Sequence, residues 1–385
     1  MIIERRLDLQ YLLQQKSHFL FGPRAVGKST LISLQLADQA EVIDLLDPQV
    51  FLRISNNVNG LRGMITESKH DLVVIDEVQR LPALLNEVHM LIEREGRRFL
   101  LTGSSTRKLR RGGANMLAGR AWLAHLLPLT RGEINAFDLD RFLLYGGLPA
   151  VLFSKYPDKE LAAYVLTYMR EEVQAEGELR DLAPFSRFLR TMALANGEVI
   201  NFSKLANDCQ CPVRDVRSYV EILEDILLGS LLPPWTRSRK RKAVSTAKFY
   251  FFDTGVARTL AAIASLDRNS NLYGKAFEHF IWMELRAYLA YSERGLTTLS
   301  YWRSRYGHEV DFLVGEELAI EVKTTTAVSN RDLKGLQALA EEKVFAKLYL
   351  ISNDPLPAKH GNIRCLPWQT FLDKLWAGEL ALLHK

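Results

Sequence analysis

Residues 18–30 read HFLFGPRAVGKST. The apolar run at 18–21 predicts a buried strand, and residues 31–36 continue with the apolar spacing of a helix. Between them the sequence fits G-x-x-x-x-G-K-[ST], the pattern of a phosphate-binding loop. Such a loop needs a buried strand before it and a helix after it, so that backbone N–H groups and the helix dipole converge on an anion. The alternative is a glycine-containing surface loop that fits the pattern by chance.

Each residue type in this loop has a physical reason to be there. Gly22 and Gly27 let the backbone turn tightly and approach phosphates without a Cβ in the way. Lys28 brings a positive charge to the β and γ phosphate oxygens, and Ser29 is expected to ligate Mg²⁺. The predicted nucleotide-binding residues are Gly22, Pro23, Arg24, Ala25, Val26, Gly27, Lys28, Ser29 and Thr30.

A second segment supports the first. Residues 72–75 read LVVI, a run of buried-strand character that ends in the acidic pair Asp76 and Glu77. This is the Walker B pattern, in which Asp76 holds the Mg²⁺ shell and Glu77 polarises the attacking water as general base. The alternative is a strand followed by a solvated acidic turn.

Two further stretches supply candidate catalytic groups. The strand predicted at 98–103 ends among small hydroxyl residues, and we expect Thr102 and Ser104 to act as a polar sensor near the γ-phosphate. Arg120 follows Gly119 just before an apolar run. It is either a finger that stabilises transition-state charge at a neighbouring subunit's nucleotide or an ordinary surface arginine.

These motifs together carry a family resemblance. GPRAVGKST (22–30), VVIDEVQRLP (73–82), LLTGSST (100–106), the GRA step at 119–121 and HLLPLTRGE (125–133) resemble the AAA+ ATPases of bacteria and archaea that carry a C-terminal domain of unknown function, DUF4143. The resemblance covers most of the chain. It implies ATP and Mg²⁺ as cofactors, ATP hydrolysis, and a homo-oligomeric ring, usually a hexamer.

Composition sets wider limits. A chain of 385 residues with 48% hydrophobic content predicts two or three domains, and a net charge of +5 with a pI near 9.0 permits a polyanionic partner. Three cysteines do not make a disulfide framework, and Cys209-x-Cys211 lacks a second ligand pair for zinc. We find neither a signal-peptide pattern nor an apolar run long enough to span a bilayer, so we expect no membrane partner and a cytoplasmic location.

The motif positions divide the chain. The predicted fold class is α/β, with a P-loop AAA+ ATPase domain built on a parallel sheet at 1–135. A helical lid and winged-helix domain follows at 136–265, and a PD-(D/E)xK nuclease-like α/β domain at 266–385. In the middle domain, apolar residues have helix-like spacing at 160–174, 184–195, 202–208 and 213–228.

The last two of these helices flank a short Cys-Pro turn, the layout of a helix-turn-helix. Residues 231–235 and 248–253 are then predicted as the strands of a wing, with RSRKRK at 237–242 as its tip. From Trp235 to Lys248 there are six basic residues and no acidic one, which suits contact with a phosphate backbone. The alternatives are a solvated loop or a contact with an acidic protein. The predicted DNA-contacting residues are Arg214, Arg217, Arg237, Arg239, Lys240, Arg241 and Lys242.

The C-terminal third carries a separate set of charged residues. GKAFEHFIWMEL at 274–285 predicts a helix, and HEVDFLV at 308–314 and LAIEVK at 318–323 predict two adjacent strands. Together they resemble the PD-(D/E)xK nuclease core. Asp311 and Glu321 are expected to converge on one Mg²⁺, with Lys323 on the same face of its strand and Glu278 contributing from the helix. The alternative is a salt-bridged structural cluster without activity.

Three functions remain open on the sequence alone. The first is a DNA-dependent AAA+ motor or remodeller, with branched DNA among its possible substrates. The second is an ATP-regulated Mg²⁺-dependent DNA nuclease that uses Asp311, Glu321 and Lys323. The third is a nucleotide switch whose C-terminal part binds protein partners. We favour the motor.

Overall fold

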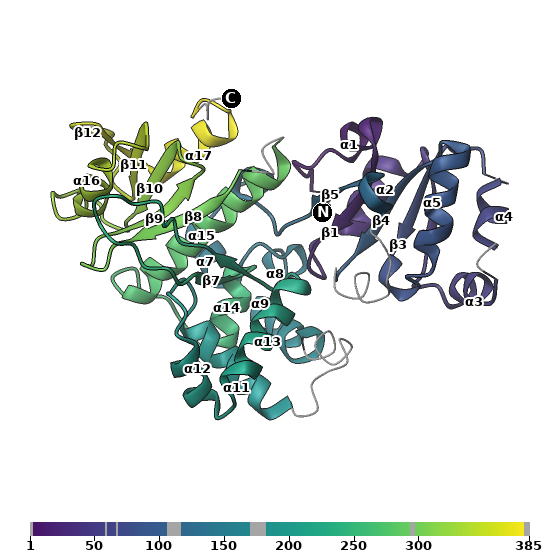
Figure 1. The fold of residues 1–385 in the computed structure, drawn as a ribbon, viewed down its shortest axis with the longest axis horizontal. Coiled ribbons are helices and arrows are strands. Elements are labelled where there is room, and N and C mark those ends of the chain that lie inside the picture. The colour runs from purple at the N-terminus through teal and green to yellow at the C-terminus, as the bar shows by residue number, and fades with distance from the viewer. Residues whose placement is uncertain are drawn as a thin grey trace. The chain divides into compact units, whose positions relative to one another are not determined.

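The chain packs as two compact units in the computed structural model, which describes residues 3–57, 60–66, 68–105, 117–169, 182–292 and 297–380 (Figure 1). The first unit comprises residues 1–136, 147–180 and 218–228, and the second comprises 137–146, 181–217 and 229–385. Residues 136–265, predicted as one domain, are thus divided between the two units. The three-domain division stays a prediction.

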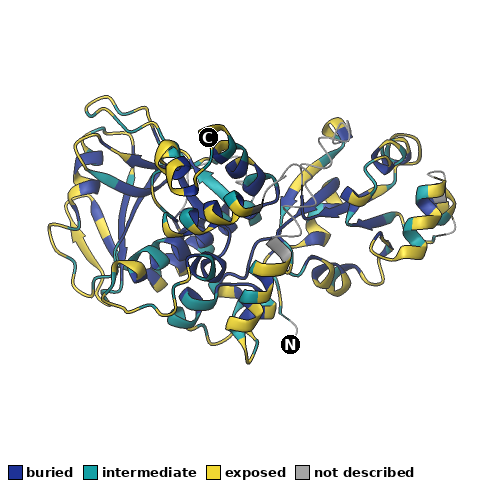
Figure 2. Ribbon diagram, turned by 90° about the horizontal axis from the view of Figure 1, so that it is seen from below, coloured by how far each residue is buried: buried dark blue, intermediate teal, exposed yellow. Residues whose placement is uncertain are grey.

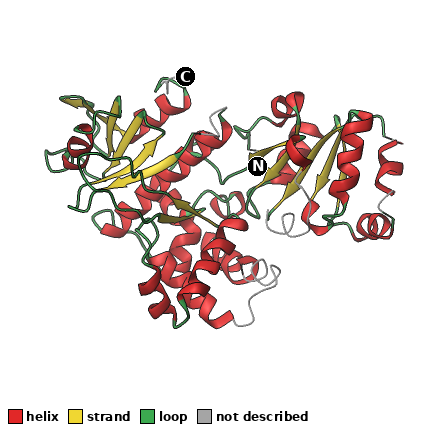
Figure 3. Cartoon of the chain, in the orientation of Figure 1, coloured by secondary structure: helices red, strands yellow, loops and turns green. Residues whose placement is uncertain are grey.

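A five-stranded parallel sheet forms the centre of the first unit (Figure 3). Its strand order is β2-β3-β4-β1-β5, and every neighbouring pair is parallel. Parallel strands covered by helices read as continuous apolar runs, which is the pattern that predicted them. The strands are β1 (Ser17–Phe21), β2 (Ala40–Asp44), β3 (Leu72–Asp76), β4 (Arg98–Gly103) and β5 (Ala121–His125). The predicted α/β class is confirmed.

Helices and short helical turns complete the first unit. They are α1 (Leu9–Gln15), α2 (Lys28–Leu36), α3 (Pro48–Asn56), α4 (Gly60–Thr66), η1 (Val78–Arg80), α5 (Leu84–Glu95), η2 (Leu117–Gly119), η3 (Arg131–Glu133), α8 (Pro149–Leu152), α9 (Pro157–Ala163) and the π-helical η4 (Tyr164–Met169). The end of α2 is tied to the start of the chain, because the Leu9 N–H donates to Gln35 Oε1 at 2.8 Å and Gln35 Nε2 donates to the Leu7 carbonyl at 3.0 Å.

The strand order positions the site. β4 lies between β1, which leads into the phosphate loop, and β3, which ends at Asp76. Figure 2 shows these central strands buried, and the fully buried Phe19, Ile75 and Leu101 belong to one hydrophobic core. Because the carboxyl ends of parallel strands share one edge of the sheet, residues at 22–30, 76–77 and 102–104 meet there.

A six-stranded mixed sheet forms the centre of the second unit, in the order β12-β13-β11-β10-β9-β8. β8, β9 and β10 are antiparallel neighbours, and β10, β11 and β13 are parallel. A turn at Gly315, whose φ of 57° favours glycine, joins β9 to β10. The strands are β8 (Leu299–Arg303), β9 (Glu309–Val314), β10 (Leu318–Val322), β11 (Lys347–Ser352), β12 (Ala358–His360) and β13 (Ile363–Pro367).

The helices of this unit include the predicted 202–208 and 274–285 segments. They are α7 (Leu139–Tyr145), α11 (Leu182–Leu194), α12 (Phe202–Cys209), α14 (Thr254–Leu260), α15 (Asn271–Tyr291), α16 (Lys334–Ala340) and α17 (Trp368–Trp376). Helix α13 (Val213–Asp225) begins in this unit and continues in the first. The helix predicted at 160–174 is observed as α9 and η4, and its last residues lie outside the described ranges.

A two-stranded antiparallel hairpin pairs β6 (Gly229–Leu232) with β7 (Lys248–Phe251). Both strands are shorter than predicted, and β6 begins earlier. We call residues 233–247, which connect them, the basic segment. It does not project as a wing tip, because it is hydrogen-bonded along β8: Trp235 N donates to Tyr301 O at 2.7 Å and Val244 N donates to Arg303 O at 2.8 Å. The edge of β8 thus gains a partner that the local sequence pattern does not reveal.

Candidate functional site

The phosphate loop connects buried strand β1 to helix α2. Gly27 is the residue before the helix and has φ 96°, a left-handed conformation that favours glycine. A Cβ on Gly22 would lie 2.3 Å from the Leu126 carbonyl oxygen, so a side chain does not fit there. Both glycines of the motif are therefore required by the backbone path.

Lys28 is buried at the first position of α2. Its ammonium donates to the carbonyl oxygens of Gly22 at 2.7 Å and Pro23 at 3.2 Å, so the loop carbonyls hold its charge inside the loop. A positive group at the N-terminus of a helix suits a phosphate, because the helix dipole there is also positive.

Three oxygen-bearing side chains meet beside the loop. The Ser29 hydroxyl donates to Asp76 Oδ2 at 2.8 Å, and the Thr102 hydroxyl donates to Asp76 Oδ1. Asp76 and Thr102 are buried at the ends of β3 and β4. Hydroxyl and carboxylate oxygens are the ligands that Mg²⁺ prefers, so Ser29 and Asp76 fit a magnesium ion bound with nucleotide.

Glu77 lies next to this group in a left-handed conformation, φ 59°. Its N–H donates to Thr102 Oγ1 at 3.1 Å, and its carboxylate accepts from the Gln79 side-chain amide. The same amide nitrogen donates to Ser104 Oγ at 3.2 Å, so the buried Gln79 joins Glu77 to Ser104. The sequence analysis did not single out Gln79. Its position three residues after Asp76, within the same motif, is the feature that could have indicated it.

Arg120 pairs with Glu93 of α5 in the same unit, and its side chain is 32% exposed. This contact neither requires nor excludes a role at a neighbouring subunit. The finger function of Arg120 stays a prediction.

A buried ion pair between Arg5 and Glu133 contacts the phosphate loop. Arg5 donates to the Val26 carbonyl at 2.7 Å, to the Leu127 carbonyl at 2.6 Å and to Glu133 at 3.0 Å. The Arg5 and Glu133 side chains are 5% and 1% exposed. Glu133 lies in the HLLPLTRGE block, for which the sequence suggested no structural role.

In the second unit, the residues that the sequence analysis compared with a nuclease core lie on neighbouring elements. Asp311 on β9 and Glu321 on β10 are buried on neighbouring antiparallel strands. Lys323 Nζ donates to Glu321 Oε1 at 2.5 Å, and Asp311 Oδ2 accepts from the Val322 N–H at 2.9 Å. We call these residues, with Glu278, Glu309 and Lys248, the acidic cluster.

Lys248 and Glu309 are the members of the acidic cluster that sequence reasoning missed, and Lys248 is the cation among them. Its Nζ lies 3.1 Å from Glu278, 2.6 Å from Glu309 and 3.8 Å from Asp311, and its side chain is 4% exposed. Its position six residues after the basic run at 237–242 gave no sign that its side chain would be buried.

Burial and charge shift the titration of this cluster. Burial, followed by the charge of Glu278, raises the pKa of Asp311 to about 7, and burial and Asp311 raise the pKa of Glu321 well above its usual range. Burial opposes the charged form of Lys248, but Glu278, Tyr250, Asp311 and Glu309 outweigh it and raise its pKa. The cluster therefore keeps its lysine charged and favours a proton on its buried carboxyl groups.

The acidic cluster does not present a ready-made metal site. Within the described ranges, no group of three or more His, Cys, Asp or Glu residues is arranged to hold a metal ion. One feature points the other way: Glu321 Oε2 is buried without a hydrogen-bond partner among the described residues. Magnesium binding by Asp311 and Glu321 stays a prediction.

Three consecutive segments of the chain match known protein families. Residues 14–135 match the family described as an AAA domain, 136–267 match a domain of unknown function, DUF8612, and 273–371 match DUF4143. The uncharacterised proteins Rv2008c of Mycobacterium tuberculosis and Mb2031c of Mycobacterium bovis are 30% identical over 346 residues, which cover 86% of this chain and 76% of each relative. This chain belongs to their family of AAA-domain proteins with a C-terminal DUF4143 domain.

More distant similarities are also found. The uncharacterised protein MJ1544 of Methanocaldococcus jannaschii is 22% identical over 345 residues, 81% of this chain and 75% of that protein. The replication initiator DnaA bound to AMPPCP and single-stranded DNA has a TM-score of 0.32 at 12% identity and matches 58% of this chain and 90% of that one. Domain III of Thermotoga maritima DnaA has a TM-score of 0.22 at 16% identity, over 55% and 84%.

The basic segment is tied to the DUF4143 domain by carboxylates. Arg237 pairs with Glu316 at 2.9 Å, and Arg241 pairs with Glu341 at 2.9 Å. The carboxylate of Glu342 accepts from the backbone N–H groups of residues 239 and 240. Residues 239 and 240 are exposed, and residue 242 is exposed as well.

The predicted helix-turn-helix residues differ in their surroundings. The Arg214 side chain is 93% exposed, with Asp215 at 3.6 Å as its ion-pair partner. The Arg217 guanidinium instead lies over the Phe202 ring, 4.2 Å from its centroid. Both arginines are exposed, and the Arg217 guanidinium is in addition packed against an aromatic ring.

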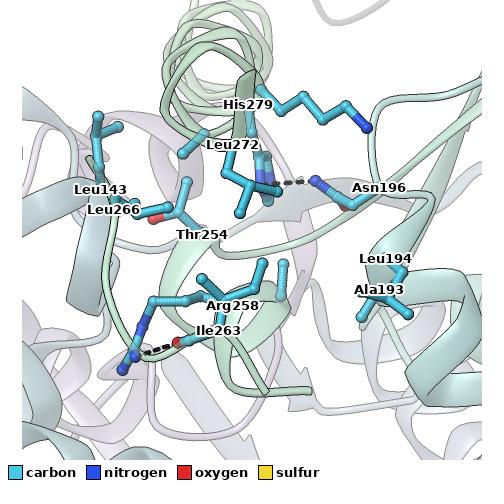
Figure 4. Close-up of a pocket in the computed structure, with 13 residues that line it drawn as sticks. Leu143, Ala193, Leu194, Asn196, Thr254, Arg258, Ile263, Leu266, Leu272 and His279 are labelled. Atoms are coloured by element: carbon cyan, nitrogen blue, oxygen red, sulfur yellow. Dashed lines mark hydrogen bonds between the residues drawn. The ribbon is translucent and has the colours of Figure 1, made fainter. Parts of the chain in front are cut away.

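A pocket of about 50 Å³ lies beside His279 in the second unit (Figure 4). His279 Nε2 donates to the Phe251 carbonyl at 2.7 Å and Nδ1 accepts from Asn196 Nδ2 at 3.1 Å, which fits a neutral ring. Burial lowers the pKa of His279 to about 4. The pocket has room for water, because one water needs about 10–15 Å³ of such a volume.

None of the helices in the described ranges is long and apolar enough to cross a membrane.

Proposed function

We propose that this protein hydrolyses ATP and uses the hydrolysis to move along or remodel DNA. The observation that carries the first half is the contact of Ser29 with Asp76 at 2.8 Å, which joins the phosphate loop to the end of β3. In P-loop ATPases these two positions hold the magnesium ion that bridges the phosphates. Lys28 neutralises the phosphate charge from within the loop.

Glu77 is the proposed general base for the attacking water. Its backbone N–H donates to Thr102, which in turn donates to Asp76, and its carboxylate accepts from the Gln79 side-chain amide. A bound Mg²⁺ would neutralise charge on the phosphates during transfer. Gln79 then orients Glu77, and Ser104 holds Gln79 from the neighbouring strand.

DNA is the proposed partner of the exposed cations. Arg214, Arg239, Lys240 and Lys242 are exposed, and exposed lysines and arginines bind phosphates by releasing counterions. We further propose a homo-oligomeric ring, in which Arg120 reaches a neighbouring subunit's nucleotide. The ring is then required for hydrolysis and not for nucleotide binding.

The test is ATP hydrolysis by the full chain with single-stranded, duplex and four-way-junction DNA across a salt series. DNA-stimulated hydrolysis that declines steeply with salt and is absent in Lys28→Ala supports the motor. If none of these DNAs changes the rate of ATP hydrolysis, a nucleotide switch that binds protein partners becomes the better explanation. The ion pairs of the basic segment with Glu316 and Glu341 are the observation that favours this second candidate.

The nuclease is the remaining candidate. It rests on the placement of Asp311, Glu321 and Lys323 on neighbouring strands. Nicking of supercoiled plasmid with Mg²⁺, lost in Glu321→Ala and retained in Lys28→Ala, would favour it over the motor.

A further inference from the structure

The acidic cluster already contains a cation that belongs to the chain. Lys248 projects from β7 and lies within 3.8 Å of carboxylates on α15 and β9, at Glu278, Glu309 and Asp311. Its side chain is almost fully buried, at 4% exposure. A lysine ammonium can be buried in its charged form only where carboxylates compensate its charge.

The other donors around these carboxylates also come from the chain. The Tyr250 hydroxyl donates to Glu278 at 2.5 Å, the Val322 N–H donates to Asp311, and Arg303 lies 3.6 Å from Glu309. Lys323 pairs with Glu321. Among the described residues, the cations Lys248, Arg303 and Lys323 therefore face the carboxylates Glu278, Glu309, Asp311 and Glu321, which leaves little negative charge for a divalent ion.

A magnesium ion would also need room and oxygen ligands. It takes six ligands in near-octahedral geometry, and the position between Glu278, Glu309 and Asp311 is filled by the Lys248 ammonium. Glu321 Oε2, the buried oxygen of the acidic cluster that has no partner among the described residues, is a single atom and not a ligand set.

We propose that Lys248 is the resident cation of the acidic cluster, compensating the carboxylates of Glu278, Glu309 and Asp311 in place of a divalent metal and fastening the β6–β7 hairpin to α15 and the six-stranded sheet. The DUF4143 domain then uses its nuclease-like residues as an internal anchor. In this arrangement the C-terminal end of the basic segment is held in place by the same cluster.

The experiment measures metal binding and thermal stability of the full chain without nucleotide. All samples carry Asp76→Asn to remove the proposed magnesium ligand of the AAA domain, and Mn²⁺ binding is followed by electron paramagnetic resonance. We expect no Mn²⁺ bound at the acidic cluster and a melting temperature that is unchanged by Mn²⁺ or Mg²⁺. One bound Mn²⁺ that is lost on adding Glu321→Gln would overturn the proposal.

A charge-removing variant gives the positive arm. Lys248→Ala should melt at a lower temperature, and Mn²⁺ should partly restore it, because the ion fills the vacated position. Lys275→Ala is the matched control: it removes a cation from α15 that pairs with the exposed Glu198, and should show neither effect. If Lys248→Ala does not fold, the Mn²⁺ measurement on the parent chain still decides. Neither readout requires ATP or DNA, so failure here is separate from failure of the proposed function.

Discussion

Ser29 and Asp76 lie 47 residues apart in the chain and are joined by a hydrogen bond of 2.8 Å between the serine hydroxyl and the carboxylate. The bond links the start of α2 to the end of β3 across the top of β4. It places the two proposed magnesium ligands side by side.

The first prediction concerns nucleotide binding. ATP with Mg²⁺ should raise the melting temperature of the chain, because at about 100 times the dissociation constant a ligand stabilises the folded state by about 2.7 kcal/mol. Lys28→Ala and Asp76→Asn should lose most of this shift in differential scanning fluorimetry. Asp71→Asn, a control at an exposed carboxylate before β3, should keep it. An undiminished shift in Lys28→Ala would contradict the site.

The second prediction separates Glu77 from Gln79. Glu77→Gln should lower kcat for ATP hydrolysis about 10²–10⁴-fold while nucleotide still binds, because the general base is removed. Gln79→Ala should lower kcat about 10–100-fold, because it removes only the group that orients Glu77. Steady-state kinetics together with nucleotide binding would show this. Equal loss of binding and turnover in Gln79→Ala would indicate a collapsed site.

The third prediction concerns the Arg5–Glu133 pair. Arg5→Ala should lower the free energy of unfolding by about 3–5 kcal/mol, because it leaves the buried Glu133 carboxylate without its cation. Arg62→Ala removes an exposed pair with Glu95 and should cost about 0–1 kcal/mol. Urea denaturation measures both. A decrease below about 1 kcal/mol in Arg5→Ala would show that the pair does not support the AAA domain.

The fourth prediction is a dependence of stability on pH at His279. Its folded-state pKa of about 4 is below the ordinary 6.5, so the unfolded chain binds the extra proton and stability falls as pH falls from 6.5 toward 4. This group alone should cost about 2 kcal/mol at pH 5 relative to pH 7.5. His279→Gln should therefore lose less stability than the parent over that range. Parallel curves of unfolding free energy against pH would rule this out.

The fifth prediction concerns DNA. Replacing Arg239, Lys240 and Lys242 together by serine should weaken binding to all DNA sequences alike, and the slope of log affinity against log salt should flatten by about 0.9 for each phosphate that the protein no longer binds. Replacing the surface residues Arg62, Lys275 and Lys374 is the charge-matched control. Fluorescence anisotropy across a salt series measures both. Equal effects of the two triple variants would point to net charge and not to the basic segment.

The AAA fold was predictable because its signals are local. The strand before Gly22, the glycines themselves and the run ending at Asp76 each act over a few residues, and the parallel strand order brings them together. The cluster of Asp311, Glu321 and Lys323 was predictable for the same reason, since it needs only two adjacent strands.

The missed features depend on contacts between distant residues. Arg5 and Glu133 are 128 positions apart, and nothing in the sequence near either one marks it as buried. Lys248 was predicted as the first residue of the second strand of the wing, with no sign that its side chain is buried, yet β7 turns it toward α15 and β9. The basic segment was expected as a free wing tip, because the open edge of β8 that binds it cannot be seen in the local pattern.

The ties at the start of the chain have a mechanical meaning. Arg5 is hydrogen-bonded to the Val26 carbonyl in the phosphate loop. The backbone of Leu7 and Leu9 is hydrogen-bonded to the Gln35 side chain near the C-terminal end of α2. The segment from Arg5 to Leu9 is thus hydrogen-bonded near both ends of α2. If the phosphate loop is displaced, this segment and α2 must move together, or the hydrogen bonds at one of the two ends must break.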